Sequence, residues 1–419
     1  MSYIGLLKQY PRYISYGMAY FFFSSLGQTF LFSLFIPNLE TAFGMTPAES
    51  GTYYGIASLM SAGLILYTGS FVDKWNLRIF GGLVALVLGL SAFLMASAQT
   101  LAVMLVAMFL LRHFGQGLMI QTASTAVARY FTDNRGKAIS LKSLGISVAE
   151  GILPTIVAFI IATIGWRSGM MVLGASCLLV CLPMNLFMLK KDERFTQPIQ
   201  DDEEPSPVQQ KAATTVGHLP DTEELNWSRK QLLTHPYFWM ILLHAVGPAF
   251  IVTGLFFQQV AMAEGQGWSI TLMASGFLAF GLVRTIGSLC IGPVVDKLTG
   301  TKLLPISTLP MALGISCLLL NDSPYLVYAY MGLMGFSIGI SGTISTSMWV
   351  EVYGRKHLGA IKSMIMALAV FSTALSPPLV GYLFEHGTTA DQIATYAIGY
   401  TLFASFLAWV AKPPKGAKK

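Results

Sequence analysis

The sequence predicts an all-α membrane protein, with twelve transmembrane helices in two six-helix bundles related by a pseudo-two-fold axis. Three observations lead to this fold class. The 419 residues are 54% hydrophobic and only 11% charged, against about 25% charged for a soluble chain. Apolar stretches of about 20 residues, enough for a helix to cross the hydrocarbon core, recur along the chain. A charged turn that follows the second stretch returns after the eighth, which indicates that the second half repeats the first.

The apolar stretches are expected to be helices because a helix satisfies its own backbone hydrogen bonds in the hydrocarbon core. Few charged residues interrupt them. In chain order, the expected spans are residues 13–36, 49–72, 79–98, 101–124, 138–163, 168–189, 236–262, 269–294, 303–320, 325–350, 358–384 and 391–411.

The spans divide the chain into a six-helix bundle over residues 1–190, a linker over 191–235 and a second six-helix bundle over 236–419. The linker begins with a polar segment rich in Pro, Gln, Asp and Glu, which is expected to be disordered. Its acidic run could alternatively bind a partner. The linker's last part is expected to form a short amphipathic helix that places Trp227 and Leu232 at the membrane surface.

The basic residues predict the orientation in the membrane. Of the 26 lysines and arginines, nearly all that lie outside the spans fall in loops on the N-terminal side, and only Arg167 is expected on the opposite face. By the positive-inside rule both termini are expected in the cytoplasm, with the protein in the plasma (inner) membrane. The net charge of +6 therefore does not indicate nucleic-acid binding. All four cysteines fall within spans, which indicates free core thiols.

Two charged motifs recur in the second half of the chain. The turn Gly69-Ser-Phe-Val-Asp73-Lys74 follows the second span, and Gly292-Pro-Val-Val-Asp296-Lys297 follows the eighth. Lys142 and Lys362, each seven residues after an arginine, enter the fifth and eleventh spans, and their separation in the sequence nearly equals that of the two turns. This agreement indicates a six-plus-six repeat, for which a substrate site is expected at the interface of the halves near mid-membrane.

The turn after the second span, extended to Arg78, resembles the loop motif between helices 2 and 3 of the major facilitator superfamily. The turn after the eighth span resembles the weaker copy of that motif between helices 8 and 9. The resemblance covers essentially the whole chain and implies a monomeric secondary transporter. It also implies a gating role for the motif residues, which are Gly69, Asp73, Lys74, Arg78, Gly292, Asp296 and Lys297.

Within the superfamily, the chain is similar to the oxalate/formate and monocarboxylate carrier branch. The similarity lies in residues 234–239 entering the seventh span, residues 128–136 after the fourth span and an arginine in the eighth span, Arg284. The chain departs from that branch in three ways. Lys362 lies about a turn nearer the cytoplasm than the helix-11 lysine of oxalate carriers, and Arg284 lies about a turn deeper than their helix-8 arginine. Phe280 stands where animal monocarboxylate carriers tend to have an acidic residue, and the first span has no basic residue after Arg12.

Arg284 lies inside an otherwise apolar span. It precedes Asp296 by twelve residues, which at about 1.5 Å per residue places it roughly 18 Å from the charged turn, close to mid-membrane. An arginine at that depth is expected to face the bundle interior or a water-filled cavity. A guanidinium makes bidentate, charge-assisted hydrogen bonds to a carboxylate, so Arg284 is the predicted anion contact. The alternative is a structural role, although spans 7 to 12 hold no acidic residue at its depth.

Arg112 in the fourth span and Glu150 in the fifth lie at a similar depth and are expected to pair. A buried carboxylate takes up a proton unless a cation holds it ionised, so the pair is a candidate proton-coupling site, with His113 beside it. A permanent ion pair that packs two helices is the alternative. Arg112 with Gly115 and Gly117 also resembles the helix-4 motif of proton-driven drug exporters, with the spacing off by one.

Four further polar residues are candidates for substrate binding: Lys142, Lys362, Gln28 and Gln116. The two lysines lie several residues inside the cytoplasmic edge, where they could line an inward-facing cavity for an anion or extend to the lipid headgroups. The two glutamines could face a pore. His244 in the seventh span is a candidate proton carrier or a packed histidine.

The sequence contains no phosphate-cradling glycine motif, metal-spaced cluster or nucleophile motif, so no enzymatic activity, metal or cofactor is expected. The predicted function is secondary active transport of small organic anions, with monocarboxylates as substrates, alternating access as the mechanism and proton symport as the coupling. The expected partners are the anion, protons and membrane lipid. Two alternatives stay open: a proton-driven exporter of lipophilic drugs, and a transporter-like sensor that binds the anion without moving it.

Overall fold

The computed structural model describes residues 3–131, 135–189, 227, 229–320, 323–354 and 358–414, and all regular elements in these ranges are helices. Eleven of them are long and apolar enough to cross a membrane, and a bent pair, Pro11–Gly27 with Thr29–Phe43, makes the twelfth span. The predicted all-α membrane fold is therefore confirmed. The polar part of the predicted linker and Arg355 lie outside the described residues.

The helix ends agree with the predicted spans to within a few residues, except in the first and fourth spans. In the first half the elements are α1 (Tyr3–Gln9), α2 (Pro11–Phe23), η1 (Ser24–Gly27), α3 (Thr29–Phe32), η2 (Ser33–Phe35), α4 (Ile36–Phe43), α5 (Pro47–Thr68), α6 (Phe71–Lys74), α7 (Leu77–Ser97), α8 (Leu101–Leu110), η3 (Leu111–Met119), α9 (Ile120–Tyr130), α10 (Arg135–Ile164) and α11 (Trp166–Met188). In the second half they are α14 (Arg229–Thr234), α15 (Pro236–Phe257), α16 (Gln259–Gly265), α17 (Ile270–Leu298), α18 (Gly300–Leu303), η4 (Leu304–Ile306), α19 (Leu309–Ser316), η5 (Cys317–Leu319), α20 (Leu326–Tyr353), α21 (Leu358–Glu385) and α22 (Ala390–Val410).

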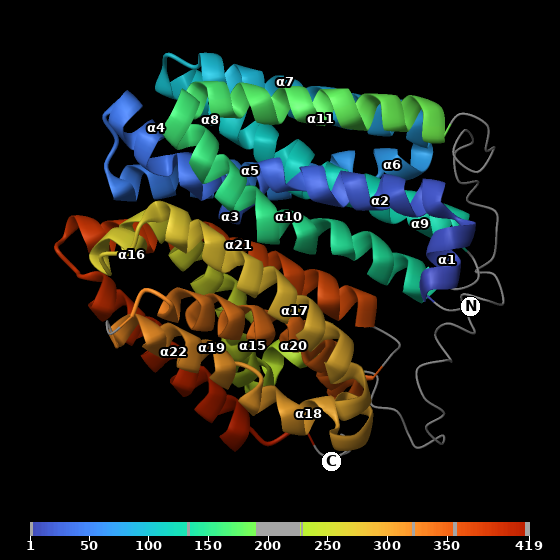
Figure 1. Ribbon diagram of the computed structural model, residues 1–419. Coiled ribbons are helices and arrows are strands. Elements are labelled where there is room, and N and C mark those ends of the chain that lie inside the picture. Colours follow the sequence, from blue (N-terminus) through green and yellow to red (C-terminus); the bar gives the residue numbers. More distant parts are fainter. Residues whose placement is uncertain are drawn as a thin grey trace.

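The two halves form two layers of helices (Figure 1). The halves meet mainly along two helix pairs, α5 with α21 and α10 with α17. In span numbers these pairs are 2 with 11 and 5 with 8. A pseudo-two-fold axis exchanges spans 2 and 8 as well as 5 and 11, so it converts one pair into the other. The interface is thus built twice from equivalent helices.

The first span is broken, whereas a single helix over 13–36 was expected. Its two parts are bent by 51°, and Gln28 at the break is extended, with ψ of 148°. The break follows from the contact between Gly27 and the fourth span, where a Cβ on Gly27 would overlap the carbonyl oxygen of Leu111. Only glycine permits this approach, and the close contact replaces a regular helical turn.

The short helix α14 packs on protein, whereas Trp227 and Leu232 were expected at the membrane surface. Leu232 is fully buried. The backbone N–H of Trp227 donates to the carbonyl oxygen of Tyr353 at 3.2 Å, and the Trp227 ring lies edge-on to the ring of Tyr353. The end of the predicted linker is therefore anchored on α20 of the second half.

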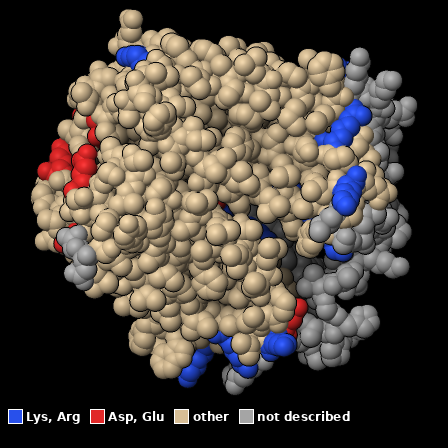
Figure 2. Space-filling model, in the orientation of Figure 1, with Lys and Arg blue, Asp and Glu red and all other residues tan. Residues whose placement is uncertain are grey.

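The two halves pack closely against each other at one end of the bundle. We call the end with residues 69–76 and 292–300 the motif end, and the end with residues 44–46 and 386–389 the far end. Near the far end, Gln259 donates from Nε2 to the carbonyl oxygen of Phe30 at 3.1 Å, and Gln258 donates to that of Pro47 at 3.3 Å. Figure 2 shows a hollow between the halves, with Lys or Arg atoms visible inside it.

Glycine contacts allow the close approach at the far end. A Cβ on Gly381 of α21 would overlap the carbonyl oxygen of Pro47 at the start of α5. One turn further along α5, a Cβ on Gly51 would lie 2.6 Å from the carbonyl oxygen of Pro377. Without side chains at these positions, the two backbones can pack directly against each other.

Replacing Gly381 by valine is expected to push α5 and α21 apart at the far end, because overpacked contacts force backbone shifts. A reporter cysteine at Ser33, a fully buried position, should then react severalfold faster with a maleimide. The matched control is Gly63→Val in α5, where a Cβ would meet nothing within 4 Å. Equal labelling rates in the two variants would contradict the prediction.

Candidate functional site

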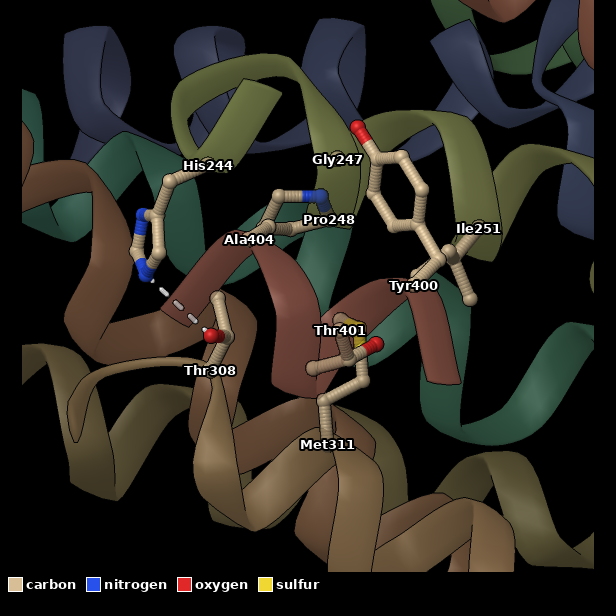
Figure 3. A pocket seen from close by; sticks show the side chains of 9 residues that line it. All are labelled: His244, Gly247, Pro248, Ile251, Thr308, Met311, Tyr400, Thr401 and Ala404. Carbon is tan, nitrogen blue, oxygen red and sulfur yellow. Dashed lines mark hydrogen bonds between the residues drawn. The ribbon is translucent and has the colours of Figure 1, made fainter. Parts of the chain in front are cut away.

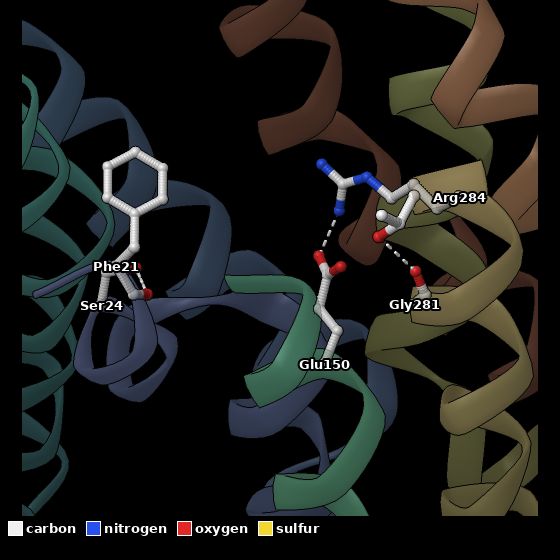
Figure 4. A network of polar contacts seen from close by, with 6 residues as sticks. Phe21, Ser24, Glu150, Gly281 and Arg284 are labelled. Carbon is white, nitrogen blue, oxygen red and sulfur yellow. Dashed lines mark hydrogen bonds and ion pairs between the residues drawn. The ribbon is translucent and has the colours of Figure 1, made fainter. Parts of the chain in front are cut away.

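An ion pair joins the two halves at the middle of the bundle. Arg284 of α17 donates from Nη1 to Oε1 of Glu150 on α10 (Figure 4). The Glu150 side chain is 8% exposed, and the Arg284 side chain is 32% exposed. The second carboxylate oxygen of Glu150 is buried and has no hydrogen-bond partner among the described residues. The pair is therefore closed on the side of the carboxylate and partly open on the side of the guanidinium.

Close helix packing fixes the backbone that carries Arg284. A Cβ on Gly281, one turn before it, would lie 2.8 Å from the carbonyl oxygen of Ser147 on α10. On the other side of α17, a Cβ on Gly335 or Gly339 of α20 would overlap the carbonyl oxygens of Phe280 and Arg284. The helix is thus held between α10 and α20, which fixes the point from which the Arg284 side chain extends toward Glu150.

The predicted pairing of Arg112 with Glu150 is wrong. Arg112 is buried, donates from Nη1 to the carbonyl oxygen of Gly27 at 3.0 Å, and lies 4.6 Å from the centre of the Tyr54 ring. The break at Gln28 leaves Gly27 at the end of a helical segment, where carbonyl groups lack helical donors. Arg112 supplies a donor there, so it stabilises the broken first span.

The fourth span contains a π-helical segment, η3, that carries three of the predicted site residues. Such segments are rare and occur often at functional sites. Within η3, His113 hydrogen-bonds with Ser61 at 3.4 Å and with Thr68 at 3.1 Å, and both partners belong to α5. Gln116 is exposed, whereas His113 is tied within the first half.

The two candidate lysines have different surroundings, although they occupy equivalent places in the repeat. Lys142 is buried, donates from Nζ to Oγ of Ser124 at 2.6 Å, and lies 3.8 Å from the centre of the Phe21 ring. Lys362 on α21 is exposed. Gln28 is half-buried at the break in the first span. Of the predicted site residues, the structure brings Glu150 and Arg284 into direct contact.

His244 lies inside the second half (Figure 3). Its Nε2 hydrogen-bonds with Thr308 at 3.2 Å, and Thr308 hydrogen-bonds with Ser405 at 2.8 Å. A cavity of about 10 Å³ lies beside these groups, large enough for about one water molecule. These contacts are those of a packed, hydrogen-bonded histidine.

The two motif loops are held by residues that the sequence analysis did not select. Arg129 of α9 donates to the carbonyl oxygens of Val72 at 2.8 Å and Asp73 at 3.2 Å, and lies 3.9 Å from the Asp73 carboxylate. In the second half, Glu351 of α20 accepts hydrogen bonds from the backbone N–H groups of Gly300 and Thr301 at 2.7 and 2.9 Å.

Arg129 and Glu351 are separated in the sequence by nearly the same offset as the two loop motifs. They therefore occupy equivalent positions in the repeat, and this offset is the signal that could have identified them.

The other motif residues have different surroundings. Lys74, Asp296 and Lys297 are exposed. A Cβ on Gly69 would lie 2.9 Å from Oε1 of Gln121, whereas a Cβ on Gly292 would meet nothing within 4 Å. The backbone N–H of Arg78 donates to Oδ1 of Asn76 at 2.9 Å, and its carbonyl oxygen accepts from Asn185.

Comparisons with known proteins agree on one family. Residues 17–301 and 249–419 match the model of the Major Facilitator Superfamily. The chain is 23% identical over 408 residues to monocarboxylate transporter 12 of Rattus norvegicus, which covers 92% of this chain and 82% of the relative. It is 22% identical over 404 residues to monocarboxylate transporter 6 of Mus musculus, with coverages of 91% and 82%.

Among solved structures, the chain is similar to a bacterial homologue of the human lysosomal transporter Spinster in an inward-facing, unoccupied conformation. The TM-score is 0.68 at 14% identity, over 95% of this chain and 97% of that one. This likeness extends to the two-bundle arrangement. The family match spans nearly the whole sequence, so the chain belongs to the Major Facilitator Superfamily.

Proposed function

We propose that the protein is a secondary transporter of small monocarboxylates that works by alternating access and couples transport to proton symport. The observation that carries this proposal is the Arg284–Glu150 ion pair between the two halves. The relatives named monocarboxylate transporters support the substrate class. The family is one of transporters, and enzymatic activity forms no part of the proposal.

The ion pair gives a physical link between anion binding and proton uptake. A substrate carboxylate that reaches the partly open guanidinium of Arg284 competes with Glu150 for the same donors. Displaced from Arg284, the Glu150 carboxylate would be a buried anion without a counter-ion, which is costly. Glu150 then takes up a proton, and the substrate and the proton bind together.

Charge balance in the site favours symport of one proton with one monocarboxylate. Without substrate, the positive charge of Arg284 is balanced by Glu150. With substrate, it is balanced by the bound carboxylate, while protonated Glu150 is neutral. The site thus has no net charge in either state. Both states can therefore reorient across the membrane without carrying a net charge through the low-dielectric interior.

The position of the pair suits alternating access. Arg284 and Glu150 lie on α17 and α10, one of the two equivalent helix pairs along which the halves meet. Breaking and re-forming this pair changes a contact between the halves rather than one within a half. Glu150, on the N-terminal half, takes the place of the acidic residue expected one turn before the arginine, where this chain has Phe280.

The drug-export alternative rested on the resemblance of Arg112, Gly115 and Gly117 to a helix-4 motif of drug exporters. Arg112 bonds the carbonyl oxygen of Gly27 and takes no part in the Arg284–Glu150 pair. The cationic side chain of Arg284 between the halves disfavours the cationic substrates of such exporters. The distribution of lysine and arginine supports placing both termini in the cytoplasm. Membership of the superfamily supports a monomeric carrier, which we place in the plasma (inner) membrane.

Uptake into proteoliposomes tests the proposal. Labelled lactate, pyruvate, acetate and oxalate would be compared with glucose and a lipophilic cation, each with and without a pH gradient. For symport of one proton with one monocarboxylate, accumulation on the alkaline side should reach about tenfold per pH unit. Accumulation of monocarboxylates that does not respond to the gradient would refute symport, and transport of the cation alone would refute the substrate class.

A further inference from the structure

A groove of about 440 Å³ lies between α7 and α11 at the motif end of the first half. Its polar lining is Asn76, Arg78 and Asn185, and its apolar lining includes Ile79, Leu182 and Leu186. The two helices run side by side on the side of the first half that faces away from the second half (Figure 1). The groove is therefore separate from the interface that holds the Arg284–Glu150 pair.

The polar part of the groove contains a guanidinium with one buried donor that has no hydrogen-bond partner among the described residues. Asn185 is hydrogen-bonded through both polar atoms: its Oδ1 accepts from the hydroxyls of Tyr16 and Tyr20 at 3.1 Å each, and its Nδ2 donates to the carbonyl oxygen of Arg78. The Nε of Arg78 is buried and has no hydrogen-bond partner among the described residues. A buried donor without a partner is costly, so the guanidinium favours an oxygen-rich ligand.

The apolar part of the groove faces outward. Ile79 is 63% exposed and Leu186 is 49% exposed, as is expected of side chains that contact lipid in a membrane-spanning bundle. Arg12 adds a second cation nearby, since it donates to the carbonyl oxygen of Phe187 at the end of α11. The groove has Arg78 in its polar part, Arg12 close to the end of α11, and exposed aliphatic side chains in its apolar part. This arrangement matches a phospholipid, which carries a phosphate above its acyl chains.

The second half has no equivalent of Arg78. The repeat offset that leads from Gly69 to Gly292 leads from Arg78 to Thr301, whose hydroxyl donates to Glu351 at 2.7 Å. The guanidinium is thus a feature of the first half, and it is not needed to complete the motif loop, which Arg129 holds.

The geometry points to a binding site for an anionic phospholipid in this groove, with the lipid phosphate on the Arg78 guanidinium and an acyl chain along Ile79 and Leu186. The site is occupied from the leaflet that faces the motif end. It binds lipid at the outer surface of the first half, independently of the transported anion.

Native mass spectrometry of the purified full-length protein tests this site with three probes: dioleoylphosphatidylglycerol, dioleoylphosphatidylcholine and inorganic phosphate. The wild type is expected to retain phosphatidylglycerol in preference to phosphatidylcholine and to retain no inorganic phosphate. Arg78→Gln should weaken phosphatidylglycerol binding by about tenfold, because it removes a charge-assisted bond. The control Lys302→Gln, an exposed cation at the same end of the second half, should change nothing.

A second variant distinguishes loss of the site from loss of the fold. Leu186→Trp fills the groove while keeping Arg78, and it should also displace phosphatidylglycerol, whereas Arg78→Lys should retain the preference for the anionic lipid. Unchanged phosphatidylglycerol binding in Arg78→Gln or Leu186→Trp would overturn the proposal. So would equal binding of phosphatidylcholine, or binding of inorganic phosphate that Arg78→Gln abolishes, since the latter would indicate a free-anion site.

Discussion

Replacing Arg284 by alanine is expected to lower monocarboxylate uptake by about tenfold to a hundredfold. The substitution removes the charge-assisted bond to the substrate carboxylate, and such bonds contribute about 1.5–3 kcal/mol. It also leaves Glu150 buried without its cation, so a loss of thermal stability is expected as well. Initial rates of uptake into proteoliposomes, at substrate concentrations below saturation, measure the first effect.

Two further variants separate substrate binding from stability. The double variant with Arg284→Ala and Glu150→Gln has no uncompensated charge, so it should recover stability without recovering uptake. Thr285→Ala changes the next residue, whose hydroxyl bonds the carbonyl oxygen of Gly281 on its own helix, and should transport normally. Uptake at the wild-type rate in Arg284→Ala would eliminate this residue as the anion contact.

Replacing Glu150 by glutamine is expected to abolish accumulation driven by a pH gradient while leaving anion exchange intact. The amide mimics the protonated acid and cannot ionise, so Arg284 stays available to the substrate at every pH. In the wild type, anion binding takes up a proton and should weaken as pH rises. In Glu150→Gln, binding should be independent of pH.

Anion exchange is measured as counterflow of labelled substrate, and accumulation is measured as uptake driven by a pH gradient. Comparing the two assays shows which activity Glu150→Gln retains. Glu40→Gln is the matched control, because Glu40 is a half-buried carboxyl that accepts a hydrogen bond from Ser50 within the first half. If Glu150→Gln accumulated substrate against its gradient as the wild type does, the proton would have to bind elsewhere, and the coupling role of Glu150 would be refuted.

Helix positions could be predicted from the sequence because the hydrocarbon core imposes a length on each span. The depths of Arg284 and Glu150 in the membrane can be predicted by counting residues from the ends of their spans. Their contact cannot be predicted in this way, because the count does not say toward which neighbouring helix a side chain points. Arg112 lies at a similar height to Glu150 and in the preceding span, which made it the apparent partner.

The symmetry of the repeat indicates which spans meet between the two halves. If span 2 meets span 11, the pseudo-two-fold axis requires that span 5 meet span 8, and these are the spans of Glu150 and Arg284. The role of Arg112 was harder to predict. It depends on the break at Gln28, which results from a close approach between Gly27 and Leu111. The pattern of apolar residues does not predict this break.

The opposite charges of Arg129 and Glu351 also bear on how the chain assembles correctly in the membrane. The two halves are similar enough that each loop could, during folding, contact the helix of the wrong half. Glu351 beside the carbonyl groups of Val72 and Asp73 would be repelled, as would Arg129 beside the backbone N–H groups of Gly300 and Thr301. The reversal of charge thus gives each loop a single favourable partner and discriminates against mispaired halves.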